Sequence, residues 1–129
     1  MAVPKLRQSD GLITYPLRIG AYLHHVRITL VFDLNGSIMF GRSSIALGSM
    51  PIVDLSPFNA QELGVSRHHL MMTRNEDHIA VTDNNSSNGS FLNDQRLEPQ
   101  VSYPVHHGDK IGLGLLTMQI HFITDPFNF

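Results

Sequence analysis

Cysteine is absent from this chain of 129 residues. Its absence excludes disulfides, thiol nucleophiles, thiolate zinc sites and iron–sulfur clusters together. A chain without cysteine is indifferent to the redox state of its compartment, which favours the cytoplasm as its location. We expect a single domain, because a chain of this length buries roughly two-thirds of its unfolded surface without a metal or disulfide.

An excess of charge and a long apolar run are also missing. The net charge is -2 and the lysines and arginines are dispersed. The chain therefore has no broad positive field that would bind nucleic acid or an acidic membrane. No aromatic platform for stacked bases is evident either. Pro16 and Arg18 interrupt the only apolar stretch near the N-terminus, so neither a signal peptide nor a membrane span is expected. Turn composition therefore explains the N-x-S matches at Asn35, Asn84, Asn85 and Asn88.

Apolar residues occur in strand-sized bursts rather than with a helical period. The bursts lie at 27–32, 37–40, 69–73, 78–82, 90–92, 110–116 and 118–124. Turn signals such as Asn35-Gly36 and His107-Gly108-Asp109 separate them, which predicts an antiparallel all-β sandwich or barrel. One helical turn is expected between Ser56 and Gly64, and the backbone before Val26 is expected to be irregular.

Three short segments carry polar residues that a strand pattern does not require. They are "FGRSS" at 40–44, "GVSRHHL" at 64–70 and "DNNSSNGSFLN" at 83–93. Loops at strand ends cluster at one end of a sandwich, so these segments are predicted to meet there. A cluster of guanidinium, hydroxyl and amide donors suits a phosphate group.

These blocks, followed by "GDKIGLG" at 108–114, resemble the forkhead-associated (FHA) domain. The resemblance covers roughly residues 27–124. It implies an eleven-stranded antiparallel β-sandwich that binds phosphothreonine peptides and performs no catalysis. We expect the FHA domain at 26–125, an irregular extension at 1–25 and a short tail at 126–129.

The resemblance also implies roles for individual residues. Arg42 would pair with the phosphate, Ser66 and Ser87 would donate hydroxyls to it, and Arg67 would contact phosphate or peptide backbone. Asn88 would hold the peptide main chain. Support of the binding loops is expected from Gly41, His69, Asp83, Gly89 and Asn93.

The chain departs from the usual family pattern in four places. Ser87 and Ser90 stand where threonine is common, and Asn93-Asp94 stands where Asn-Gly is usual. A serine keeps the hydroxyl but loses the methyl that restricts its rotamers, so binding is expected to be weaker but to survive. The segment between Arg42 and Ser66 is long, so peptide selectivity cannot be copied from relatives.

Other classes of function are less well supported. Adjacent histidines such as His68-His69 point to opposite faces of a strand, so no metal and no cofactor is expected. No G-x-S-x-G, H-E-x-x-H or Walker motif occurs, so an enzyme is not expected. The expected partner is a protein in which a Ser/Thr kinase has phosphorylated a threonine. This chain is expected to bind it as a monomeric signalling adaptor. The rival is an FHA-like scaffold that docks an unmodified partner through a sheet face or strand edge.

Overall fold

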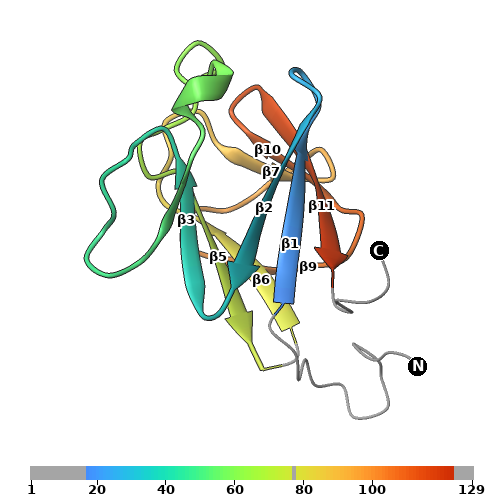
Figure 1. Ribbon diagram of the computed structural model, residues 1–129. Helices are drawn as coiled ribbons and strands as arrows, with labels where there is room; N and C mark the ends of the chain where they lie inside the picture. Colours follow the sequence, from blue (N-terminus) through green and yellow to red (C-terminus); the bar gives the residue numbers. More distant parts are fainter. Residues whose placement is uncertain (1–16, 77, 124–129) are drawn as a thin grey trace.

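Two β-sheets face each other in the computed structural model, which describes residues 17–76 and 78–123 (Figure 1). The strands are β1 (Leu17–Leu23), β2 (Ile28–Leu34), β3 (Ser37–Gly41), β4 (Ile52–Asp54), β5 (Leu70–Asn75), β6 (His78–Asp83), β7 (Ser90–Leu92), β8 (Gln95–Arg96), β9 (Ser102–Val105), β10 (Lys110–Leu113) and β11 (Leu116–Ile123). A single 3₁₀ turn, η1 (Ser56–Phe58), follows β4 in the described residues. The structure confirms the predicted all-β, eleven-stranded sandwich.

The larger sheet has the strand order β2-β1-β11-β10-β7-β8, and the smaller has the order β4-β3-β5-β6-β9. Neighbouring strands run antiparallel with one exception, because β3 and β4 are parallel. This pair departs from the predicted antiparallel arrangement. The connection at 42–51 causes it, since the chain must return along the length of β3 before β4 begins.

The core lies between the two sheets and is built by alternation along the strands. In β1 the side chains of Leu17, Ile19, Ala21 and Leu23 are fully buried, whereas Arg18 faces solvent. In the opposite sheet, Phe40 of β3 is fully buried and meets the ring of Phe32 edge-on. The two sheets therefore share one apolar interior.

The expectation of irregular backbone through residue 25 is wrong for residues 17–23, which form β1. This strand pairs with β2 on one side and with β11 on the other. The sequence pattern does not predict this strand, because Arg18 interrupts the apolar run. Arg18 occupies an outward position, where it pairs with Asp33 of β2 at 3.2 Å. Residues 1–16 and 124–129 lie outside the described residues.

Two further differences concern turns. The burst at 110–116 is not one strand, because Gly114, at φ +58°, turns the chain from β10 into β11. The helical turn at Ser56 is shorter than expected, and the chain continues in turns as far as Gly64. No helix among the described residues has the length and apolar character needed to span a membrane.

Candidate functional site

The three polar segments meet at one end of the sandwich, beside η1 (Figure 1). Arg42 follows the last residue of β3, Ser66 and Arg67 precede β5, and Ser87 and Asn88 lie in the loop between β6 and β7. Hydrogen bonds between the segments hold them together: Arg42 Nε donates to Val65 O, and Ser87 N donates to Ser66 Oγ. The structure thus brings the five predicted binding residues to neighbouring loops.

Arg42 is oriented by its own backbone neighbours. Its Nε donates to the carbonyl of Val65 at 2.7 Å, and its main-chain N donates to Ser66 O at 3.2 Å. Within the described part of the chain, the terminal nitrogens of this guanidinium donate to no protein atom. The side chain is half-buried, so these terminal nitrogens remain available as a pair of directed donors for a ligand.

Gly41 permits the close approach of two backbone segments. A Cβ placed on this residue would lie 1.8 Å from the carbonyl oxygen of Arg67. Real carbon–oxygen contacts are never this short, so any side chain here would push β3 away from the segment before β5. Gly41 therefore sets the distance between Arg42 and the Ser66–Arg67 segment.

His69 joins two loops from beneath. Its side chain is fully buried, with Nδ1 accepting from Ser66 N at 2.9 Å and Nε2 donating to Gly89 O at 2.9 Å. These partners fix the neutral tautomer with the proton on Nε2. Burial lowers the pKa of His69, while the hydrogen bond to Gly89 and the charge of Asp83 oppose that shift. The imidazole is thus a neutral brace in the usual physiological pH range.

Asp83 organises the loop between β6 and β7. Its carboxylate is buried and accepts hydrogen bonds from the main-chain N and hydroxyl of Ser86 and from the hydroxyl of Ser90. Burial raises the pKa of Asp83, but these hydrogen bonds and the nearby His69 outweigh it and lower the pKa overall. A charged carboxylate therefore holds the loop that carries Ser87 and Asn88.

Ser66 has a hydroxyl hydrogen available for a ligand. Its Oγ accepts from Ser87 N at 3.1 Å, which uses the oxygen as an acceptor and leaves the O–H uncommitted among the described residues. The Ser87 side chain beside it is exposed. Arg67 is also exposed, and its guanidinium has no hydrogen bond or ion pair in the described part of the chain.

Asn88 is held by the loop that precedes β5. Its Nδ2 donates to Gly64 O at 3.0 Å, and a Cβ on Gly64 would lie 2.7 Å from that nitrogen. The residue is exposed, and its amide oxygen and second N–H have no hydrogen-bond partner in the described part of the chain. This geometry presents one acceptor and one donor, the pair needed to bind a peptide main chain.

Of the predicted supporting residues, Gly89 ends the loop between β6 and β7, whereas Asn93 lies beyond β7. The Gly89 carbonyl accepts from both His69 Nε2 and Gly114 N. Asn93 lies in the turn between β7 and β8, where its side chain donates to Asp109 and accepts from Lys110 N. Those partners sit at the start of β10, away from the binding loops, so Asn93 supports a different part of the fold from the one expected.

Sequence reasoning missed two contributors to this end of the molecule. Ser86 donates to Asp83 and accepts from Gly89 N, a local bond that the Asp-x-x-Ser spacing could have revealed. Leu115 is 78% exposed, and the apolar burst at 110–116 predicts a strand where the structure has the tip of a turn between β10 and β11.

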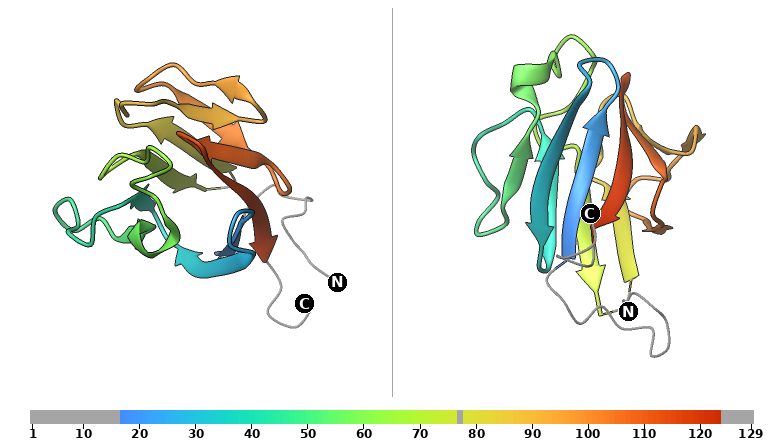
Figure 2. Two further views of the ribbon diagram at one scale, coloured as in Figure 1. Left: turned by 90° about the horizontal axis from the view of Figure 1, so that it is seen from above. Right: turned by 45° about the vertical axis from the view of Figure 1, so that its right-hand side comes forward.

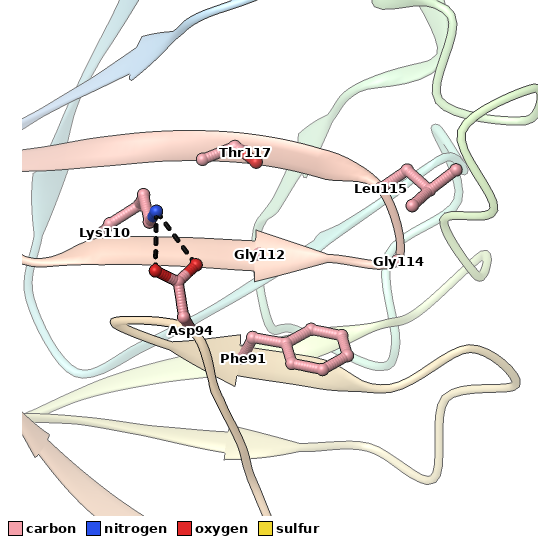
Figure 3. A pocket seen from close by; sticks show the side chains of 7 residues that line it. All are labelled: Phe91, Asp94, Lys110, Gly112, Gly114, Leu115 and Thr117. Carbon is pink, nitrogen blue, oxygen red and sulfur yellow. Dashed lines mark hydrogen bonds and ion pairs between the residues drawn. The ribbon is translucent and has the colours of Figure 1, made fainter.

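Beside Asn88 the surface is hollowed. One hollow is lined by Glu62, Leu63, Gly64, Asn88, Phe91, Gly114 and Leu115. A second hollow adjoins the first and shares Phe91, Gly114 and Leu115 with it. This second hollow extends over Gly112 to Thr117 and to the ion pair between Lys110 and Asp94 (Figure 3). The apolar lining of both is supplied largely by Phe91 and Leu115. The polar donors at Asn88 thus border an apolar depression.

Comparison with known proteins identifies the class of domain. The FHA domain family model matches residues 38–114, more than half of the chain, and the chain belongs to the FHA family. The E3 ubiquitin-protein ligase RNF8 of Bos taurus and that of Homo sapiens are each 44% identical over 54 residues, which cover 41% of this chain and 11% of the ligase. The similarity to these ligases is therefore confined to a small part of their length.

Solved structures agree with the fold. The solution structure of an FHA domain from an Arabidopsis thaliana hypothetical protein matches with a TM-score of 0.67 and 26% identity, over 95% of this chain and 98% of that one. A structure from a study of phosphothreonine-dependent FHA domain interactions matches with a TM-score of 0.60 and 23% identity, over 81% and 95% of the two chains. The chain thus has the fold of an FHA domain.

Proposed function

We propose that this protein binds phosphothreonine peptides through the loop end of its sandwich, as an adaptor acting downstream of Ser/Thr kinases. The observation that carries the proposal is Arg42, whose Nε is fixed on Val65 O while its terminal nitrogens are unused among the described residues. A phosphate carries about -1.5 to -2 charges at neutral pH and three acceptor oxygens, which match such directed donors. The phosphothreonine-dependent interactions studied for a structural relative support the same ligand class.

The remaining residues divide between phosphate and peptide. Ser66 and Ser87 would donate hydroxyls to the phosphate, and exposed Arg67 would contact a phosphate oxygen or the peptide backbone. Asn88, held by Gly64, would bind the peptide main chain. The peptide would then extend from Asn88 over the depression between Leu63, Phe91 and Leu115.

A degenerate phosphothreonine peptide library, with the same library treated with phosphatase as its control, tests the proposal. Binding should require the phosphate and should fall in Asn88→Ala by about 1 to 3 kcal/mol, because a desolvated peptide group loses its partner. Retention of a peptide regardless of phosphatase treatment would instead support the rival, a scaffold that docks unmodified partners.

A further inference from the structure

The two sheets have four edge strands, and three of them resist pairing with another chain. β8 has only two residues and β4 only three, while β9 contains Pro104, which has no N–H to donate. β2 differs from all of these. It has seven residues, "ITLVFDL", with neither proline nor lysine, and among the described strands it pairs with β1 alone. Figure 2 shows β2 at the margin of its sheet, with β1 beside it and β11 on the far side of β1.

Edge strands expose a row of unpaired main-chain donors and acceptors, and β2 adds apolar side chains to that row. Val31 at the middle of the strand is 55% exposed, and Ile28 at its start is 41% exposed. Leu30 and Phe32, which alternate with the outward residues, are only partly buried against the core. A second strand beside β2 would remove both the polar groups and this apolar surface from water.

The sequence of β2 is complementary to itself in one antiparallel register. With Val31 opposite Val31 of a second copy, Thr29 lies opposite Asp33 and Leu30 lies opposite Phe32. The hydroxyl of Thr29 then faces the carboxylate of Asp33, and the apolar side chain of Leu30 faces that of Phe32. No two like charges lie opposite each other in this register. Arg27, an exposed cation just before β2, comes diagonally close to Asp33 of the second copy.

We propose that β2 pairs with β2 of a second copy of this chain about a two-fold axis at Val31, joining the two larger sheets into one. Such an interface is closed, because the same strand serves both copies. The proposal replaces the monomer expected from the sequence and does not depend on phosphopeptide binding. Antiparallel pairing would point the two loop ends in opposite directions, so a dimer could bridge two phosphorylated partners.

The absence of cysteine allows a direct test of the register, since one introduced thiol has no native competitor. Residues opposite each other across paired strands lie within the Cα separation that a disulfide requires. Val31→Cys should therefore form a covalent dimer under mild oxidation. Thr29→Cys alone should not, but a mixture of Thr29→Cys with Asp33→Cys should form the mixed dimer.

Val101→Cys is the matched control, because Val101 is also an exposed valine beside an edge strand. Cross-linking of Val31→Cys should be about tenfold faster or more at low micromolar protein, where paired thiols have a far higher effective concentration than colliding ones. Equal rates for Val31→Cys and Val101→Cys would overturn the proposal, and so would equal rates for Val31→Cys and Thr29→Cys.

Sedimentation velocity tests the same interface without a covalent bond. The unmodified chain should show a concentration-dependent dimer, and Val31→Lys should be monomeric, since it places two ammonium groups opposite each other. Val101→Lys should dimerise like the unmodified chain, and far-ultraviolet circular dichroism should show both variants folded. A chain that stays monomeric at every concentration would contradict the proposal.

Discussion

Gly41 is the residue whose replacement the backbone geometry resists most. Its missing side chain lets the Arg67 carbonyl lie where a Cβ would be, so Gly41→Ala must displace β3 or the segment before β5. We expect Gly41→Ala to lose roughly 1 to 3 kcal/mol of unfolding free energy or more, as overpacked sites do, and to bind phosphopeptide poorly. Urea denaturation and a peptide titration measure the two effects.

Gly20→Ala is the matched control for that variant. Gly20 lies inside β1, and a Cβ there would meet Thr29 at an ordinary 3.4 Å. Because alanine also restricts the unfolded chain, Gly20→Ala should be neutral or slightly stabilising. Equal losses in the two variants would show that the close approach at Gly41 is unimportant.

Arg42 should matter for binding far more than for stability. If its guanidinium meets the phosphate in a partly desolvated site, Arg42→Ala should cost about 2 to 5 kcal/mol of binding free energy. Arg42→Lys keeps the charge but loses the Nε bond to Val65 and the forked geometry, so it should recover only part of the affinity. Isothermal titration calorimetry gives the values.

Arg18→Ala serves as the control for a lost arginine. Arg18 forms an exposed pair with Asp33 on β1 and β2, away from the binding loops, so its removal should leave phosphopeptide affinity unchanged. An Arg42→Ala variant that binds like Arg18→Ala would remove Arg42 from the proposed site.

At the scale of elements, β1 is indispensable for folding, although its sequence pattern does not predict a strand. A chain shortened to residues 17–129 retains this strand, whereas one shortened to 26–129 loses the neighbour of both β2 and β11. The second should fail to fold, because four fully buried side chains are removed from the core. Circular dichroism and thermal melting distinguish the two, and a cooperative transition in the 26–129 chain would contradict the assignment of β1.

The elements also show how far the sequence could be interpreted. Bursts such as 37–40 and 78–82 became β3 and β6 because local alternation and turn residues specify them. β4 and β8 are too short to show a period, and their place depends on pairing with distant strands. At the site, ordered motifs predicted which loops meet, but only coordinates could show that Asn93 contacts Asp109 and Lys110 instead.

For the molecule as a whole, two buried groups make stability fall toward acid. The pKa of His69 lies below its ordinary value of 6.5 in the folded state, so the unfolded chain binds the proton more readily there. The stability that the neutral His69 contributes to the folded state is complete above pH 6.5 and is lost as the pH falls through the lowered pKa. The lowered pKa of Asp83 adds a second loss at still lower pH, as its carboxylate is protonated.

We therefore expect urea midpoints to decrease between pH 7.5 and 5.5, and to decrease less in His69→Gln, which has no proton to take up. His69→Gln should be less stable at pH 7.5 because it disrupts the link from Ser66 to Gly89. His24→Gln is the matched control and should keep the dependence of the unmodified chain, because His24 is exposed and its side chain has no hydrogen bond or ion pair in the described part of the chain. An unchanged slope in His69→Gln would exclude His69 as its source.

The pairing of β1 with β11 also determines how the fold would respond to mechanical force. Arg18, near the start of β1, lies opposite Ile123, at the end of β11, so both strands can be gripped at the same end of the sandwich. A pull applied there loads the hydrogen bonds of this pair one after another, as in a zipper, rather than all together. The domain should therefore unfold at low force, beginning at the end opposite Arg42. The force should reach the binding loops last.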